Sequence, residues 1–223
     1  MQRHLHRELD NIKKDLLFIG SLVKDSVEKA IVAFNESNTE LADEVIAQDK
    51  KIDAKEVAIE EECLKLLALH QPVAEDLRFI TAVMKINNAL EGMGDSATSI
   101  SKRCLHYAKR SPIAIPDELS QMSEKTVNMI EQTLKAFFQR DDVLAKAVIK
   151  LDDQVDELQA NILSKLKDIM KNDANHISVA LDVFTITRRL EGIADLATSI
   201  CEDIIYMVKG EIVRHQRKEI ASE

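Results

Sequence analysis

Apolar residues recur at intervals of three and four positions along most of the chain, which is the period of a helix with a buried face. The segment after Pro72 carries two such stripes on adjacent faces, so we expect a helix that is buried on more than one side. The stripes are Leu77, Ile80 and Met84, and Phe79, Val83, Ile86 and Leu90. Turn-like clusters at 35–38 and 172–175, together with Pro72 and the connector at 111–116, divide the chain into about six helical segments.

Composition favours an all-α fold. The 223 residues include only 5 glycines and 3 prolines, too few for the turns that a β-sandwich or barrel needs about every 8–12 residues. Apolar residues make up 45% and charged residues 31%, enough for both a core and a solvated surface. Aromatic residues make up only 4% and tryptophan is absent, which is typical of helix bundles with aliphatic cores.

The chain contains an internal duplication. Residues 86–100, INNALEGMGDSATSI, and residues 186–200, ITRRLEGIADLATSI, share the string LEGxxDxATSI. Upstream, VIAQDKKID at 45–53 matches VIKLDDQVD at 148–156, and the order of the two blocks is the same in both halves. A shared packing requirement alone would give a similar periodicity but not the same string twice.

The duplication predicts two tandem three-helix units, at residues 1–111 and 112–223, with six long helices in all. The second unit ends in a charged segment after Gly210, EIVRHQRKEIASE, which we interpret as a tail.

Each half carries two pairs of acidic residues four positions apart, a spacing that places both carboxylates on one face of a helix. The pairs are Asp49/Asp53 and Asp152/Asp156 in the second helix of each unit, and Glu91/Asp95 and Glu191/Asp195 in the third. A single pair of this kind is common on a solvated face. These four recur at equivalent positions in both halves, so we expect four carboxylates to converge in each unit.

Converging carboxylates need a compensating charge, because like charges destabilise a helix and burial adds to the cost. All-oxygen sites suit hard cations such as Mg²⁺, Mn²⁺, Ca²⁺ and iron. A structural zinc site is not expected, since no Cys/His set has ligand spacing, and a ferritin-type site would need ExxH motifs. His4/Glu8 and His6/Asp10 are interpreted as surface pairs. Solvated charges without a ligand are the alternative for the acidic sets.

Several classes of function are disfavoured. The net charge of −9 argues against a nucleic-acid partner, which would need a basic face. The charged opening MQRHLHRELD favours a chain without a secretion signal, and no apolar run is long enough to span a membrane. Cys63, Cys104 and Cys201 are widely spaced and are expected to be reduced and buried, as in a cytoplasmic protein. Motifs for phosphate-binding loops or nucleophilic catalysis are lacking, so an enzyme is not expected.

The motifs resemble those of the PhoU family of bacterial phosphate-uptake regulators. The resemblance extends from about residue 5 to residue 215 and rests, besides VIAQDKKID, on LEGMGDSATSI at 90–100, LEGIADLATSI at 190–200, CLKLLALHQPVAEDLRFI at 63–80 and EDIIYMVKGEIVRH at 202–215. The last string is the most specific, because neither bundle packing nor metal binding demands it.

The resemblance implies two three-helix bundles related by a pseudo-twofold axis, with E/DxxxD motifs that bind metal ions, in some members as multinuclear iron clusters. Iron, manganese or magnesium is implied in preference to zinc. These motifs map onto two sets of residues: Asp49, Asp53, Glu91 and Asp95, and Asp152, Asp156, Glu191 and Asp195.

The resemblance also implies a cytoplasmic negative regulator of phosphate uptake and of the phosphate-starvation response. Such a protein would be a homodimeric adaptor between the ATPase subunit of a phosphate ABC transporter and a sensor histidine kinase. It would reach the membrane only through these partners. A metal-binding or metal-storing bundle without a signalling role is the alternative function.

The sequence departs from the usual family motif, which is close to LERIGDHAxNI. The replaced positions are Gly92 and Gly192 for Arg, Ser96 and Leu196 for His, and Ser99 and Ser199 for Asn. In addition, Glu56 beside the first set corresponds to Gln159 beside the second. The carboxylates are retained while their neighbours differ, so the two sites need not be equal.

Three of the five glycines, Gly92, Gly94 and Gly192, lie inside the two motifs, where each costs roughly 1 kcal/mol relative to alanine. They are interpreted either as clearing space around the acidic sets or as allowing tight helix packing.

Overall fold

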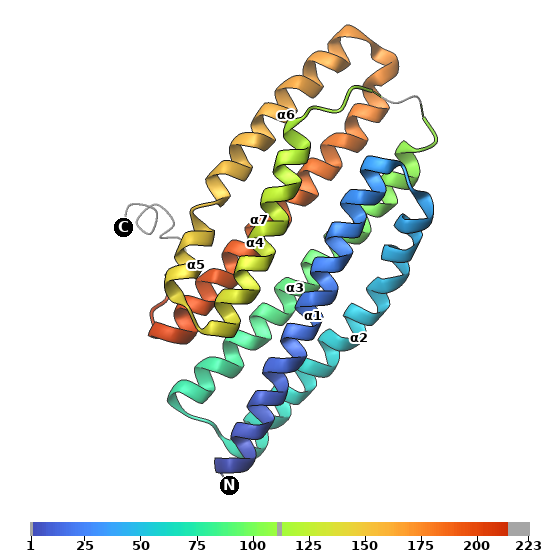
Figure 1. Ribbon diagram of the computed structural model, residues 1–223. Coiled ribbons are helices and arrows are strands. Elements are labelled where there is room, and N and C mark those ends of the chain that lie inside the picture. The colour runs from blue at the N-terminus through green and yellow to red at the C-terminus, as the bar shows by residue number, and fades with distance from the viewer. Residues whose placement is uncertain (1, 111–112, 214–223) are drawn as a thin grey trace.

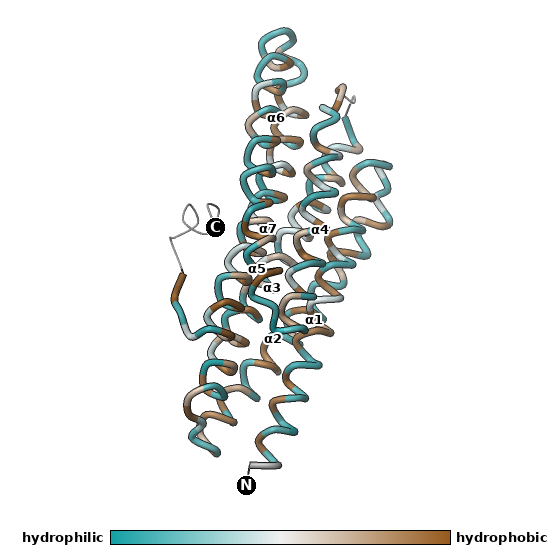
Figure 2. Tube along the Cα trace, turned by 60° about the vertical axis from the view of Figure 1, so that its left-hand side comes forward, coloured by the Kyte–Doolittle hydropathy of each residue, from teal (hydrophilic) through white to brown (hydrophobic). Residues whose placement is uncertain are grey.

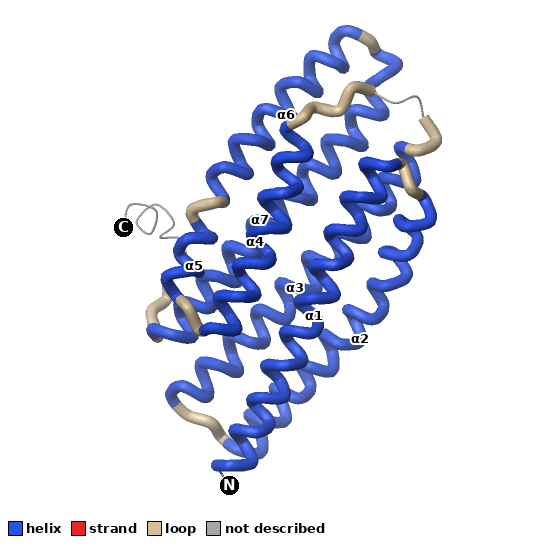
Figure 3. Tube along the Cα trace, viewed as in Figure 1, coloured by secondary structure: helices blue, strands red, loops and turns tan. Residues whose placement is uncertain are grey.

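The computed structural model describes residues 2–110 and 113–213, and within these residues every regular element is a helix (Figure 3). The first half contains α1 (Gln2–Glu36), α2 (Thr39–His70) and α3 (Ala74–Tyr107). The second half contains α4 (Glu118–Gln139), α5 (Asp142–Ile149), α6 (Asp152–Asn172), the short 3₁₀ helix η1 (Ala174–His176) and α7 (Ile177–Lys209). The predicted all-α fold is confirmed, and the fifth predicted helix is divided into α5 and α6.

Two predictions from the sequence concern residues outside those described. The predicted boundary between the two units lies at residues 111 and 112. Most of the predicted charged tail, from residue 214 to residue 223, is also outside the described part of the chain.

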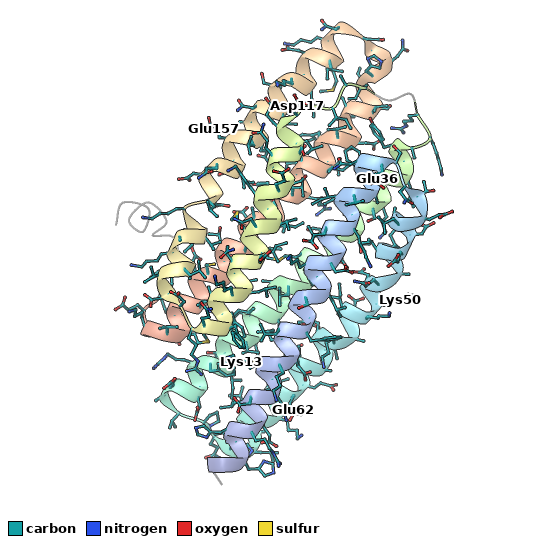
Figure 4. All side chains as sticks on the ribbon, viewed as in Figure 1. Lys13, Glu36, Lys50, Glu62, Asp117 and Glu157 are labelled. Carbon is teal, nitrogen blue, oxygen red and sulfur yellow. The ribbon has the colours of Figure 1, made fainter. Side chains whose placement is uncertain are left out.

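Two helical bundles lie side by side, with α1–α3 in one and α4–α7 in the other (Figure 1). The most extensive helix–helix interface is between α3 and α7, and α1 also packs against α4. α3 and α7 run antiparallel: Lys85, early in α3, pairs with Asp203, late in α7, at 2.8 Å, whereas Arg103, late in α3, pairs with Asp182, early in α7. The outer helices α2 and α6 carry exposed charges such as Lys50 and Glu157 (Figure 4).

The helices are amphipathic, as Figure 2 shows by the alternation of hydrophobic and hydrophilic residues along each of them. α1 buries a single stripe with steps of three and four, formed by Leu5, Leu9, Ile12, Leu16, Ile19, Val23 and Val27. Burying each such leucine or isoleucine side chain contributes roughly 1.5–3 kcal/mol relative to leaving it exposed. This spacing therefore explains both why α1 is a helix and which face it turns to the core.

α3 is buried on more than one side, as predicted, because it packs against α1 and α2 within its own bundle and against α7 in the other. All four members of the stripe from Phe79 to Leu90 are buried, and so is Ile80 of the other stripe. Leu77 is exposed and Met84 is only half-buried, so the second stripe was predicted only in part.

Local signals explain the helix ends. The side chain of Asn38 caps α2 by accepting a hydrogen bond from the backbone N–H of Leu41 at 3.0 Å, and Asp141 caps α5 in the same way. α2 ends where Gln71 adopts a left-handed conformation immediately before Pro72. α7 ends at Gly210, whose φ of 78° is the conformation that glycine adopts without strain.

The helix break in the second half has no counterpart in the first. α2 runs unbroken through VIAQDKKID, whereas the matching string VIKLDDQVD contains the turn at Lys150 and Leu151 that separates α5 from α6. The N–H of Leu151 donates to the carbonyl of Val148 at 2.9 Å, a bond of the tighter 3₁₀ type. The break therefore lies directly before Asp152, one of the predicted site residues.

Candidate metal centre

The first acidic set lies where α2 and α3 pack against each other. Asp49 and Asp53 are one turn apart on α2, Glu91 and Asp95 are one turn apart on α3, and the charge of Glu91 is influenced by the other three and by Glu56. Asp53 and Asp95 are exposed, whereas Asp49 and Glu91 are half-buried. The structure thus places the four predicted carboxylates near one another, with Glu56 beside them.

Burial raises the pKa of both half-buried carboxyls in this set. For Asp49 the negative charge of Asp53 raises the pKa further, while a hydrogen bond with Thr98 and the positive charge of Lys102 act in the opposite direction. For Glu91 the neighbouring carboxylates likewise add to the effect of burial. The set therefore holds more negative charge than its surroundings compensate.

One oxygen of the first set is buried without a hydrogen-bond partner. Oδ1 of Asp49 has no partner, and a Cβ added at Gly94 would lie 3.8 Å from it. The same Cβ would lie 3.2 and 3.3 Å from side-chain carbons of Ile52, so glycine allows α2 to approach α3 closely here. A buried acceptor without a partner costs roughly 1–3 kcal/mol, and a bound cation would remove that cost. This atom and the surplus charge fit a hard cation.

The second acidic set has a different environment. Burial and the negative charges of Asp195 and Asp156 raise the pKa of Glu191, but the positive charge of Arg188 opposes them. Nε2 of the nearby Gln159 is buried without a hydrogen-bond partner. Asp156 is exposed and Asp195 is half-buried. The second set therefore has an arginine of its own that partly compensates its carboxylates.

Asp152, the fourth predicted member of the second set, occupies a different place from its counterpart Asp49. It is the first residue of α6, directly after the helix break, and it is buried. Asp152 is not among the largest influences on the charge of Glu191. The hydroxyl of Thr198 is buried without a hydrogen-bond partner, whereas the equivalent Thr98 bonds to Asp49. The two sets are thus unequal, as the departures in sequence had suggested.

A separate group of possible ligands lies at the far end of the first bundle. Nδ1 of His4 is 3.2 Å from Oε1 of Glu8, and Nε2 of His70 is 2.9 Å from Oε2 of the same carboxylate. Among the described residues, these are the only three or more His, Cys, Asp or Glu ligand atoms that all lie within 4.8 Å of one another. The sequence indicated His4/Glu8 as a surface pair but gave no signal for His70, which is 62 positions from Glu8.

The cysteines are poor candidates for chemistry. Cys63, Cys104 and Cys201 are all unpaired and buried, as predicted. Burial raises the pKa of Cys63 and of Cys201 to about 12, and it also raises that of Cys104. The thiolate form that would act as a nucleophile is therefore disfavoured. Within the described residues, none of the helices combines the length and apolar character that crossing a bilayer requires.

Comparison with known proteins identifies the family. A family model described as the PhoU domain matches the chain twice, at residues 16–104 and 119–204. The chain belongs to the PhoU family. It is 39% identical over 212 residues to a phosphate-specific transport system accessory protein PhoU homolog of Aquifex aeolicus, covering 95% of this chain and 96% of that protein. It is 32% identical to the Escherichia coli K12 accessory protein PhoU over 208 residues, covering 93% of this chain and 86% of that one.

Solved PhoU structures share the fold. The crystal structure of PhoU from Pseudomonas aeruginosa superposes with a TM-score of 0.89 at 33% identity, covering 92% of this chain and 99% of that one. The crystal structure of the phosphate transport system regulatory protein PhoU from Streptococcus pneumoniae gives a TM-score of 0.88 at 31% identity, covering 94% and 99%. The two matched PhoU domains correspond to the two bundles described above.

The positions that depart from the PhoU motif have packing and hydrogen-bonding roles in this structure. Gly92 faces α7, where its Cβ would lie 3.3 Å from Cδ1 of Leu196, so glycine serves close helix packing at this position. A Cβ at Gly192 would meet nothing within 4 Å. Ser99 accepts a hydrogen bond at 3.0 Å from Nε of Arg189, across the interface between the bundles. Of the three motif glycines, only Gly94 borders a carboxylate of the acidic sets.

Proposed function

We propose that this PhoU-family protein is a non-enzymatic accessory regulator of a phosphate transport system. The observation that carries the proposal is the similarity over nearly the full length of PhoU proteins whose names assign them to phosphate-specific transport. Because the PhoU family model matches both duplicated domains, the proposal concerns the whole two-bundle unit and not a single shared helix pair.

In the proposed role the protein is a cytoplasmic, homodimeric negative regulator. It contacts the ATPase subunit of a phosphate ABC transporter and a sensor histidine kinase, and lowers both phosphate uptake and the starvation response. The outer faces of α2 and α6 are suited to protein contacts, because they are charged and take no part in the interface between the bundles. Buried, inert cysteines agree with a role that needs no nucleophile.

The first acidic set is the proposed metal centre, held by Asp49, Asp53, Glu91 and Asp95 with Glu56 beside them. A hard cation such as iron, manganese or magnesium supplies positive charge to this surplus of carboxylates. Among the described side chains, the acidic sets do not place three oxygen atoms within 4.8 Å of one another. Metal binding therefore requires side chains of the set to rotate toward one another.

The second acidic set, formed by Asp152, Asp156, Glu191 and Asp195, is proposed as the weaker metal site. Arg188 already supplies positive charge next to Glu191, and a cation would have to compete with it. Linking α2 to α3 through metal in the first half would hold the outer helix of that bundle in place. This gives the metal a structural role in presenting a binding surface.

The proposed function is tested in a strain that lacks its own PhoU protein. Wild-type protein is expected to restore repression of phosphate uptake and to be captured with transporter ATPase and kinase components from phosphate-replete cells. The Asp49→Asn/Asp95→Asn variant is expected to repress less well, whereas Glu36→Gln, which removes an exposed acid at the end of α1 outside both sets and both outer helices, serves as the matched control. Wild-type protein that neither represses nor captures these components would overturn the adaptor proposal.

Elemental analysis of protein never exposed to chelator addresses the metal separately. Iron, manganese or magnesium bound to the wild type and reduced in Asp49→Asn/Asp95→Asn supports the metal centre. Metal retained without any effect on phosphate uptake would favour the storage function. Wild-type protein without metal would leave an adaptor whose acidic sets are solvated charges.

A further inference from the structure

The end of the first bundle opposite the α1–α2 turn brings together two imidazoles and a carboxylate. His4 and Glu8 are four positions apart and so share one face of α1. His70 is the last residue of α2, where the left-handed Gln71 and then Pro72 end the helix. The packing of α1 on α2 places these two helix ends together, so the three side chains meet although His70 is 62 positions from Glu8.

We propose that His4, Glu8 and His70 form a binding site for a zinc-class divalent cation, separate from the acidic sets. The two measured donor separations are 3.2 Å, from His4 Nδ1 to Glu8 Oε1, and 2.9 Å, from His70 Nε2 to Glu8 Oε2. Ligand atoms around tetrahedral zinc with bonds of about 2.0–2.1 Å are separated by roughly 3.3 Å. The described side chains therefore need only small rotations to bind one ion.

The burial of these side chains suits a built site better than a loose surface pair. Side chains of Glu8 and His70 are only 16% and 14% exposed, whereas that of His4 is 58% exposed. The His4 and His70 rings face each other at 6.2 Å between centroids, with the carboxylate bonded to both. Glu8 thus presents one carboxylate oxygen to each ring.

The donor set indicates which class of metal binds. Two imidazole nitrogens and one carboxylate oxygen suit Zn²⁺, and also Co²⁺ and Ni²⁺, whereas Mg²⁺ and Ca²⁺ prefer oxygen ligands alone. Three protein ligands leave the fourth tetrahedral position to water. Nε2 of His4 is 3.5 Å from a guanidinium nitrogen of the exposed Arg7, a long contact that Arg7 can leave when the metal binds Nδ1.

The proposed site lies far from the acidic sets, and it differs from them in having no full equivalent among the described residues of the second half. Along α2, His70 is 17 residues from Asp53, or about 25 Å of helix. Among the described residues of the second half, the comparable group has only two members, with Nδ1 of His176 3.8 Å from Oδ2 of Asp173. We therefore expect one ion per chain. The ion would join the first turns of α1 to the last turn of α2, as a crosslink that closes the end of the first bundle.

The test is a titration of untagged, chelator-treated full-length protein with Zn²⁺, and with Co²⁺, whose visible absorption reports four-coordinate nitrogen and oxygen ligation. The wild type is expected to bind one Zn²⁺, and His70→Gln to bind it at least about 100-fold more weakly, because a ligand is lost. His176→Gln is the matched control, since it removes the histidine that has a single carboxylate neighbour. Asp49→Asn/Asp95→Asn separates this site from the acidic set, and both controls are expected to bind Zn²⁺ as the wild type does.

Two further variants distinguish the loss of a metal ligand from a failure to fold. His4 is exposed, so His4→Gln is expected to fold normally and still lose Zn²⁺ affinity, while His70→Cys supplies another zinc ligand and is expected to retain it. The proposal is overturned if His4→Gln and His70→Gln bind Zn²⁺ as tightly as the wild type. It is equally overturned if the Asp49→Asn/Asp95→Asn variant alone loses Zn²⁺, since the ion then belongs to the acidic set. These outcomes are independent of whether the protein regulates phosphate uptake.

Discussion

Arg110 donates a hydrogen bond from Nη1 to Oδ2 of Asp182 at 2.8 Å, and this contact fastens the end of the first half to α7 of the second. Asp182 is only 3% exposed, and Arg103 reaches its other oxygen at 3.4 Å. A buried carboxylate is costly unless it is paired and hydrogen-bonded. The two arginines therefore compensate Asp182, and the packing of one bundle on the other depends on them.

The Arg103→Ala/Arg110→Ala variant is expected to lose about 3 kcal/mol of stability, because it leaves the charge of Asp182 buried without a partner. Asp182→Asn is expected to cost only about 1 kcal/mol, since the arginines are 43% and 39% exposed and can turn to water. Urea unfolding measures both. Lys165→Ala, which removes a pair with Glu118 inside the second half, should change stability by less than about 1 kcal/mol. A double-arginine variant as stable as Asp182→Asn would contradict the interpretation.

The motif glycines are expected to differ in their response to alanine. Gly192→Ala should stabilise the protein by about 0.5–1 kcal/mol, because the added Cβ meets nothing within 4 Å and alanine favours the helix. Gly94→Ala should destabilise it, because the Cβ would press on Ile52, which is buried and confined. Denaturant unfolding of the two variants provides the comparison, each serving as the other's control. Equal effects would show that packing around the two motifs is the same.

The acidic set should make metal-free protein less stable as pH rises. Asp49 and Glu91 have raised pKa values, so between the ordinary carboxyl pKa and these raised values the folded state binds more protons than the unfolded state. Stability then falls with rising pH for these groups. In chelator, Asp49→Asn/Glu91→Gln should be more stable than the wild type at pH 7 by roughly 0.5–1 kcal/mol, a gain that shrinks toward pH 4.

Glu118 supplies the control of opposite sign. A hydrogen bond with Lys165 lowers its pKa, so its contribution to stability is present at neutral pH and is lost as pH falls. Glu118→Gln should therefore lose stability relative to the wild type at pH 7 but not in acid. If both variants changed stability in the same direction, the surplus charge assigned to the first acidic set would be wrong.

Arg188 should weaken metal binding by the second acidic set. Position 188 corresponds to Asn88 in the first half, so Arg188→Asn copies the first half's residue into the second. In an Asp49→Asn/Asp95→Asn background, this change should strengthen Mn²⁺ binding up to about tenfold, or roughly 1.4 kcal/mol. Manganese titration followed by electron paramagnetic resonance measures it. Arg189→Asn is the matched control, because Arg189 bonds to Ser99 and not to the acidic set; an equal gain there would point to net charge alone.

Local signals in the sequence were sufficient to predict most of the fold. The apolar spacing predicted the helices, Pro72 marked a helix end, and the repeated LEGxxD string predicted two similar units. The break at Lys150 and Leu151 could not be predicted in this way. Both residues are good helix formers, and neither glycine nor proline is present there, so the local sequence gives no signal for the break.

The sequence predicted candidate ligands only where they belong to a duplicated motif or lie close together along one helix. The repetition of the acidic pairs and their spacing predicted the residues of the first acidic set. The sequence also placed Glu56 beside that set. The contrast between the sets depends on Arg188, which is not part of any repeated motif. The sequence gave no indication that His70 is a possible ligand. His70 contacts Glu8 only because α1 and α2 pack together, and the spacing of residues along one helix does not predict a contact between two helices.

The break between α5 and α6 also affects which helices unfold first by local fluctuation. An isolated helix of eight residues is too short to be stable in water, so α5 depends on its contacts with α4 and α7. Since tight turns bound it on both sides, α5 can detach without unravelling α6. Amide hydrogens of residues 142–149 should then exchange with solvent earlier than those of the matching stretch of α2, which belongs to one continuous helix. The duplicated halves would thus differ in local stability at matching positions of the repeat.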